Sequence, residues 1–285
     1  MSNTLDTYSF ELENDIGLKI NGIATARQSG AKLPVVIFIH GFKGFKDWGC
    51  IPYVCQKLAL CNAIAIRFDF SMNGIADPER GMFDAAVFAK NTITRQIKDF
   101  ETLVNSLKKQ SIIGIERLYD QWNGELYLLG HSLGGAIATM YSTNHNWVNK
   151  IALWASIATF RRYTDRQRLE WRKNKILDFT NTHTGQKLWL DVAYLDDIEQ
   201  NTDELSILEA ISNIKQDLLI LHGKVDISVP LKESGQLYDA SDKNRTQLFI
   251  IPHAGHTFGI DHPFSAPTKE LDLAISKTIE FFGLK

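Results

Sequence analysis

The chain has 285 residues, 44% of them hydrophobic, and a formal net charge of −2 from 31 basic and 33 acidic residues. This length and hydrophobic content suffice for one large domain with a full core, spanning residues 1–285. The nearly balanced charge gives no reason to expect a nucleic-acid partner. The sequence contains no run of eighteen apolar residues, so we expect no membrane span.

The start of the chain, Met1 to Tyr8, lacks the basic residues and the apolar stretch of a signal peptide, which favours a cytoplasmic protein. Cys50, Cys55 and Cys61 are odd in number, and their spacing matches neither a disulfide framework nor a zinc site. We therefore expect them to be reduced packing residues. The histidine spacing suits no catalytic zinc site and no dinucleotide fingerprint occurs, so no metal or cofactor is expected. The oligomeric state is left open.

The predicted elements begin with an antiparallel hairpin, residues 8–13 and 18–26, around the turn Asn14-Asp15-Ile16-Gly17. Apolar runs then alternate with helical patterns, which favours an α/β fold with a mostly parallel sheet and helices on both faces. In chain order we expect strand 35–40, helix 53–60, strand 63–70, helix 92–109, strand 125–129, helix 135–144, strand 151–156, strand 218–222, helix 231–241, strand 247–251 and helix 269–282.

About sixty residues separate the strand ending near Ser156 from the strand starting near Leu218, too many for an ordinary crossover. Within them, 164–178 and 195–211 have helix-forming patterns, and 182–190 is typical of a turn entering an extended segment. The insertion leaves the sheet at the carboxyl ends of the strands, where open α/β sheets bind ligands. We therefore expect an inserted lid at 159–214 that shapes a substrate pocket, with a solvated surface decoration as the alternative.

The segment Glu125-Leu-Tyr-Leu-Leu-Gly-His-Ser-Leu-Gly-Gly-Ala136 is an apolar strand followed by a Gly-x-Ser-x-Gly turn and the start of a helix. Such a turn pushes a serine hydroxyl out above the edge of the sheet. Gly130 and Gly134 flank Ser132 where a β-carbon would collide with the neighbouring strand or helix. Ser132 is therefore the candidate nucleophile, with a glycine-rich structural turn as the alternative.

A serine nucleophile needs a base that a third group holds in place. Asp226 follows the strand at 218–222, in a loop before Pro230, and His256 follows the last strand in the matching loop. The chain order Ser132, Asp226, His256 is the order in which such residues converge above a parallel sheet. We therefore predict Asp226 as the orienting acid and His256 as the base.

Four other residues compete for these roles. His253 and His262 are alternative bases, but His253 directly follows Pro252 and is expected too close to the sheet, while Gly255 leaves the backbone free to turn His256 inward. Asp69 and Asp261 are alternative acids, and the chain-order argument counts against Asp69, which precedes the serine turn.

The segment His40-Gly-Phe-Lys-Gly-Phe-Lys46 directly follows a predicted strand. Acyl transfer needs two backbone amides aimed at the developing oxyanion, and the loop after this strand supplies one of them in α/β-hydrolases. We predict an oxyanion hole formed by the amides of Phe42 and Leu133, with a simple glycine turn as the alternative. Lys43 and Lys46 lack the glycine spacing of a phosphate-binding loop.

These motifs resemble, over nearly the whole chain, the serine esterases and lipases of the α/β-hydrolase superfamily. The closest similarity is to small bacterial esterases of the cinnamoyl or feruloyl type and to serine aminopeptidase-like hydrolases, which share the His-Gly-Phe turn and a histidine loop near an Asp-His pair such as Asp261-His262. Ser132 departs from the cysteine of dienelactone hydrolases and from the aspartate of haloalkane dehalogenases. The glycine-containing loop around Gly74 matches the family only loosely.

The resemblance implies a serine hydrolase that cleaves carboxylic esters through an acyl-enzyme, acting on small molecules. A peptidase or thioesterase with the same residues is an alternative, and an inactive hydrolase-fold binding module is a third. Aromatic residues near the expected mouth and lid suggest an apolar or aromatic acyl pocket, although they could equally form the core of the lid itself. They are Trp48, Phe160, Tyr163, Trp171, Trp189 and Tyr194.

Overall fold

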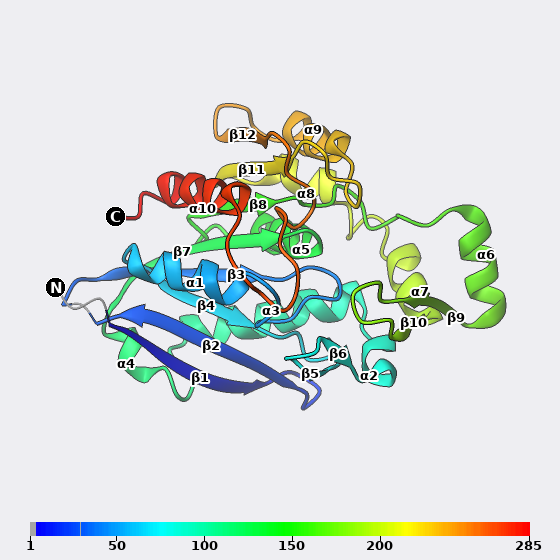
Figure 1. Ribbon diagram of the computed structural model, residues 1–285, viewed down its shortest axis with the longest axis horizontal. Coiled ribbons are helices and arrows are strands. Elements are labelled where there is room, and N and C mark those ends of the chain that lie inside the picture. Colours follow the sequence, from blue (N-terminus) through cyan, green and yellow to red (C-terminus); the bar gives the residue numbers. More distant parts are fainter. Residues whose placement is uncertain (1–3, 29) are drawn as a thin grey trace.

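The computed structural model describes residues 4–28 and 30–285 and is built around one eight-stranded sheet (Figure 1). Residues 1–3, which carry part of the expectation about a signal peptide, lie outside the described residues. The strand order is β1-β2-β4-β3-β7-β8-β11-β12. The strands are β1 (Leu5–Glu13), β2 (Lys19–Arg27), β3 (Leu33–Ile39), β4 (Ile64–Phe68), β7 (Trp122–His131), β8 (Lys150–Trp154), β11 (Asp217–Gly223) and β12 (Thr246–Ile251).

The predicted strands of the sheet are present, and their parallel or antiparallel directions are confirmed. β1 and β2 form the expected antiparallel hairpin, β2 also pairs antiparallel with β4, and the other neighbouring strands are parallel. The fold is therefore the α/β-hydrolase fold that the sequence resembles.

Each face of the sheet is covered by its own hydrophobic core. Along β3, Val35 and Ile37 belong to one core, whereas Val36 and Phe38 belong to the other, as the two-residue period of a strand requires. Helices α3 (Ile93–Lys108), α5 (Leu133–Thr143), α8 (Ile207–Asn213) and α9 (Leu231–Ala240) contribute to the first core, and α1 (Ile51–Leu60) and α10 (Lys269–Phe282) to the second. Burial on both faces explains why these strands are continuous apolar runs.

The segment between β8 and β11 contains more elements than its sequence suggests. It holds α6 (Asp165–Asn174), β9 (Ile176–Thr180), β10 (Lys187–Asp191) and α7 (Val192–Gln200) before α8, and α6 projects away from the main body (Figure 1). The predicted helix at 164–178 ends at Asn174, because Lys175 takes a left-handed conformation with φ of 65°. The chain then enters β9, which pairs antiparallel with β10.

The single helix predicted at 195–211 is wrong, since the structure has two helices, α7 and α8, separated by a turn. Asn201 ends α7, and its side chain donates to the carbonyl of Asp197. Ser206 begins α8 by accepting a hydrogen bond from the amide of Glu209. Residues of this kind prefer helix ends to helix interiors because their side chains compete for backbone groups.

Four short elements were not predicted: β5 (Ile75–Asp77), β6 (Met82–Phe83), α2 (Ala85–Ala89) and α4 (Glu116–Tyr119). The β5–β6 pair lies against the inserted segment, where Gln186 accepts from the amide of Phe83 and donates to its carbonyl. In the described part of the chain, no helix is long and apolar enough to cross a membrane.

Candidate active site

Ser132 occupies a strained turn between β7 and α5. Its φ of 56° and ψ of −117° lie outside the usual regions for a non-glycine residue, and its amide donates to the carbonyl of Trp154 at 2.8 Å. A β-carbon on Gly130 would lie 2.4 Å from the carbonyl oxygen of Gly134, and one on Gly134 would lie 2.0 Å from that of Ile39. The predicted need for glycine on both sides of Ser132 is therefore confirmed.

Asp226 and His256, thirty residues apart, meet in one hydrogen bond. The Nδ1–H of His256 donates to Oδ2 of Asp226 at 2.7 Å, and the carboxylate side chain is fully buried. The other carboxylate oxygen accepts from the amides of Ser228 at 2.8 Å and Val229 at 2.9 Å. These bonds hold the carboxylate behind the imidazole. Because Nδ1 of His256 is bonded to Asp226, Nε2 is the ring nitrogen left for a reacting group.

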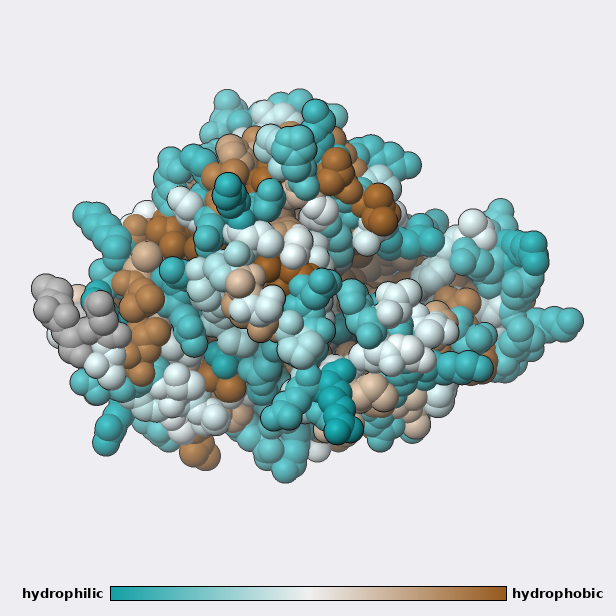
Figure 2. All heavy atoms as spheres, viewed as in Figure 1, coloured by the Kyte–Doolittle hydropathy of each residue, from teal (hydrophilic) through white to brown (hydrophobic). Residues whose placement is uncertain are grey.

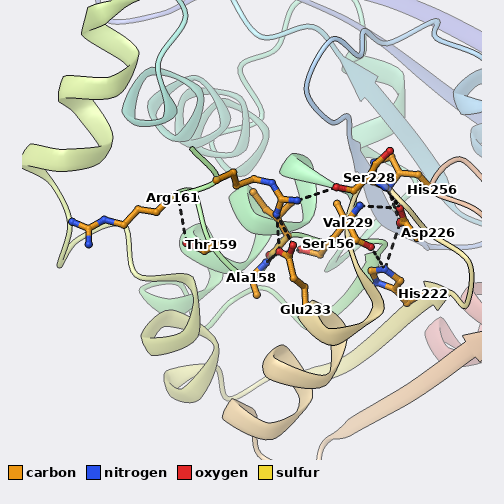
Figure 3. Close-up of polar contacts among 12 residues, drawn as sticks. Ser156, Ala158, Thr159, Arg161, His222, Asp226, Ser228, Val229, Glu233 and His256 are labelled. Carbon is orange, nitrogen blue, oxygen red and sulfur yellow. Dashed lines mark hydrogen bonds and ion pairs between the residues drawn. The ribbon is translucent and has the colours of Figure 1, made fainter. Parts of the chain in front are cut away.

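His222 is a third partner of Asp226, buried at the end of β11. Its Nε2–H donates to the carbonyl of Val229 at 2.9 Å and lies 3.4 Å from Oδ2 of Asp226 (Figure 3). Burial alone would raise the pKa of the Asp226 carboxyl, but the hydrogen bonds from His222 and His256 and the amide of Val229 hold it well below its ordinary value. The acid is therefore a stable anion at neutral pH.

The competing residues lie in other settings. His253 is exposed, with φ of 63°, so the reason given against it, closeness to the sheet, is wrong. His262 accepts from the amide of Gly49 and donates to the carbonyl of Pro78, which occupies both ring nitrogens. Asp69 accepts from the amide of Lys46 at 2.6 Å, and Asp261 is exposed.

The expectation that Gly255 frees the backbone to turn His256 inward is also wrong. This residue has an ordinary φ, and a β-carbon there would meet no atom within 4 Å, so the turn of His256 does not require glycine.

The loop after β3 packs directly on the Ser132 turn. A β-carbon on Gly41 would lie 3.0 Å from that of Ser132, which brings the backbone of the two turns together. His40 is buried and donates from Nδ1 to the carbonyl of Gly41 at 3.0 Å, which supports the loop from below. Leu133 is the first residue of α5, where a backbone N–H has no partner within the helix. The amides of Phe42 and Leu133 therefore belong to adjoining turns.

A cavity of about 560 Å³ opens over these turns, and both Ser132 and His256 line it. Four of the six aromatic residues singled out in the sequence line it as well: Trp48, Phe160, Tyr163 and Tyr194. Trp171 is instead fully buried inside the inserted segment, against Tyr163 and Tyr194. The two interpretations of the aromatic residues thus each hold for part of the set. In the view of Figure 2, hydrophobic residues lie in a recess between the main body and the projecting segment.

His131, directly before Ser132, is a site residue that the sequence analysis missed. Its Nε2–H donates to the backbone carbonyl of His256 at 2.9 Å, and the two rings lie 4.8 Å apart. Burial lowers its pKa to about 3, so the ring is neutral and a fixed donor. The histidine inside the Gly-His-Ser motif was the available signal.

Arg162 and Glu233 were also missed, and they join the inserted segment to the loop of Asp226. The guanidinium donates to both oxygens of the buried Glu233 carboxylate at 2.7 Å and to the carbonyl of Ser228 at 3.0 Å. Glu233 also accepts from the amide of Ala158 at 2.8 Å, near the end of β8. No local motif marks such a long-range pair.

Within the ranges that the structure describes, no group of three or more His, Cys, Asp or Glu side chains is placed to hold a metal ion. Cys50 and Cys55 are free and buried, and burial raises the pKa of each thiol to about 12.

Comparisons with known proteins agree with this architecture. The model of the prolyl oligopeptidase family matches residues 82–272, which include Ser132, Asp226 and His256. No curated protein matches the chain.

Among solved structures, Est1E from Butyrivibrio proteoclasticus with bound ferulic acid is 20% identical, with a TM-score of 0.72 over 95% of this chain and 97% of that one. A hydrolase from Agrobacterium vitis S4 is 16% identical, with a TM-score of 0.72 over 98% and 99%. Alpha/beta hydrolase domain-containing protein 10 from mouse is 17% identical, with a TM-score of 0.69 over 96% and 98%. These structures share the fold, and the family match covers most of the chain. The chain therefore belongs to the prolyl oligopeptidase family of hydrolases.

Proposed function

We propose that this protein is a serine hydrolase that cleaves carboxylic esters of small molecules. The observation that carries the proposal is the Asp226–His256 hydrogen bond at the wall of the cavity that Ser132 also lines. A base oriented by a buried carboxylate, facing the same space as a serine on a strained turn, is the arrangement that activates a hydroxyl.

In the proposed mechanism, Nε2 of His256 takes the hydroxyl proton as Ser132 attacks the carbonyl carbon. Asp226 stabilises the imidazolium that forms, and the amides of Phe42 and Leu133 bind the oxyanion. The imidazolium then gives its proton to the leaving alcohol as the ester C–O bond breaks. Water, deprotonated by His256, attacks the acyl-enzyme and releases the acid and free Ser132.

Residues 159–214 act, in this proposal, as a lid of the single domain 1–285. Support comes from the cavity wall, to which this segment contributes Phe160, Tyr163, Asn181 and Tyr194. The ring of Phe179 in β9 also lies 5.7 Å from that of Phe42, beside the proposed oxyanion hole. A lid so placed excludes water from the acyl group and determines which substrates fit.

A peptidase is the second candidate, and the family match favours it because the family is described by its oligopeptidases. Amides have poorer leaving groups than esters, but the same nucleophile, base and oxyanion donors serve both reactions.

A panel of acyl 4-nitrophenyl esters, thioesters and aminoacyl 4-nitroanilides separates these candidates by kcat/KM. We expect turnover of esters, abolished in Ser132→Ala, with 4-nitroanilides at least about a hundredfold slower. Faster turnover of the anilides would favour the peptidase. Folded wild-type protein that turns over none of the three, and is not labelled by a fluorophosphonate, would support an inactive binding module.

A further inference from the structure

The wall of the cavity has an unequal distribution of charge. Among the described residues that line it are one lysine, Lys43, and one arginine, Arg162, but neither Asp nor Glu. Asp226 lies behind His256, with no exposed side-chain surface. A substrate in this cavity thus meets two basic residues and no acidic residue in the described lining.

Arg162, His40 and His131, three basic residues of the cavity wall, do not supply an unpaired positive charge. Arg162 forms a bidentate contact with Glu233, so its charge has a partner inside the protein. Burial lowers the pKa of His40 to about 4 and that of His131 to about 3, so both rings are neutral at neutral pH. Of the lysine and arginine side chains in the described lining, Lys43 is the one whose charge still needs a partner.

Lys43 differs from its neighbour Lys46 in having no partner. Lys46 pairs with Asp47 and lies 3.9 Å from Asp69, and it does not line the cavity. The ammonium of Lys43 has neither a hydrogen bond nor an ion pair to any other residue in the described part of the chain. Burial also lowers its pKa, because a partly desolvated ammonium is costly without a nearby anion.

We propose that Lys43 binds a carboxylate of the substrate, so that the preferred substrates are esters that carry one negative charge near the scissile bond. The inference rests on the proposed ester hydrolysis and narrows its substrate class. Lys43 directly follows Phe42, the proposed oxyanion donor, which places the carboxylate close to the reacting carbonyl. One uncompensated lysine matches a monoanion, whereas a dianion would bring excess negative charge into the cavity.

The same charge distribution works against substrates with a free amino terminus. An α-ammonium group needs a carboxylate or several carbonyls as partners, and the described lining contains no acidic side chain. Lys43 would repel it.

The test compares matched esters that differ in charge alone. One pair is the mono-4-nitrophenyl ester of glutaric acid and the 4-nitrophenyl ester of its monoamide. A second pair, 4-carboxyphenyl acetate and 4-carbamoylphenyl acetate, places the charge on the leaving group. We expect wild-type kcat/KM to favour the carboxylate in at least one pair by about tenfold or more, less so at high salt.

Three variants assign this preference to its residue. Lys43→Met should reduce the carboxylate-to-amide ratio at least about tenfold, and Lys43→Arg should retain most of it. The ratio cancels any loss common to both esters, such as a disturbed loop. Lys32→Met is the matched control, since it removes an exposed lysine before β3, at the opposite end of that strand from His40.

Calorimetry with the Ser132→Ala variant measures recognition without turnover. Glutaramate, a monoanion, should bind more tightly than the neutral glutaramide, and Lys43→Met in the same background should remove the difference. If no ester is hydrolysed but this difference is found, the proposed function fails and the anion site stands. If esters are hydrolysed while Lys43→Met leaves both the kinetic ratio and glutaramate binding unchanged, the inference is wrong.

Discussion

Three histidines of this site hold neighbouring loops through hydrogen bonds to backbone carbonyls. His40, His131 and His222 each contact a backbone carbonyl, which only accepts, so the contacting nitrogen must be the N–H. Each imidazole is thereby fixed in one tautomer and holds one loop: the turn at Gly41, the loop of His256 and the loop of Asp226. Three histidines thus position the proposed catalytic groups.

His131 provides a direct test of this positioning role. His131→Leu removes the donor to the carbonyl of His256, and we expect kcat for an aryl ester to fall about fivefold to tenfold with KM little changed. His131→Gln, which keeps an N–H donor, should retain more of the rate. Equal losses in both variants, or a rise in KM alone, would contradict a role in orienting His256.

Asp69 makes the stability of the fold depend on pH. Burial raises the pKa of this carboxyl to about 6, so the folded protein holds the proton more tightly than the unfolded chain does. The resulting stabilisation is complete below the unfolded value of about 3.9 and is lost as the pH rises through 6. Asp69→Asn removes this titration and keeps an oxygen that can accept from the amide of Lys46.

We therefore expect the free energy of unfolding of the wild type, relative to Asp69→Asn, to fall by about 2 kcal/mol between pH 4 and pH 6. Urea unfolding across this range measures the difference. Asp261→Asn, a change at an exposed carboxyl, is the control. Parallel curves for wild type and Asp69→Asn would show that burial does not affect this titration.

The residues of the candidate site could be predicted from the sequence where a short local motif or the end of a predicted strand marks them. Ser132 lies in a motif whose glycines are required, because a β-carbon on either would lie 2.4 or 2.0 Å from a backbone oxygen. Asp226 and His256 lie in the loops that follow β11 and β12. Positions of this kind follow from topology, because parallel strands bring their carboxyl ends together. His222, Arg162 and Glu233 act through contacts between distant segments, and no local pattern records those.

At the level of elements, the inserted segment is joined to α9 through an ion pair whose carboxylate is buried. Arg162 precedes α6, and Glu233 lies in α9. Glu233 accepts from the amide of Ala158, and Arg162 donates to the carbonyl of Ser228. The loop that carries Asp226 is thus coupled to the base of the proposed lid.

The cost of breaking this pair should depend on which partner remains. Arg162→Met leaves the Glu233 carboxylate buried without its counter-ion, and we expect a loss of about 3 kcal/mol or more in the free energy of unfolding. Adding Glu233→Gln removes the charge and keeps an acceptor for the amide of Ala158, so the double variant should be more stable than Arg162→Met alone. Urea unfolding of the single and double variants measures this coupling, and additive losses would argue against it.

The elements themselves were predictable where the hydrophobic pattern is long. Strands buried on both faces give continuous apolar runs, and the helices α3 and α10 give strong periodic signals. The predicted bounds of these elements differ little from the structure. The division of 195–211 into α7 and α8 rests on capping by Asn201 and Ser206, a weaker signal within a longer apolar pattern. β5, β6, α2 and α4, with five residues or fewer each, are too short for periodicity to reveal.

At the scale of the whole molecule, one sheet brings together turns that are far apart in the chain. The loop after β3, the turn after β7, and the loops after β11 and β12 meet at one edge, where residues of the segment after β8 also line the cavity. The family match and the fold place the chain among hydrolases, and the proposed ester cleavage depends on whether Ser132 is a nucleophile.

Intact-mass spectrometry after treatment with a fluorophosphonate tests this directly, because the reagent phosphonylates an activated serine. We expect one adduct per chain on wild-type protein, mapped to Ser132 by peptide fragmentation, and none on folded Ser132→Ala. Ser228→Ala, which alters another serine of the cavity wall, should still be labelled, and His256→Ala should react at least about a hundredfold more slowly. An adduct on Ser132→Ala, or wild-type protein that stays unmodified, would contradict the account.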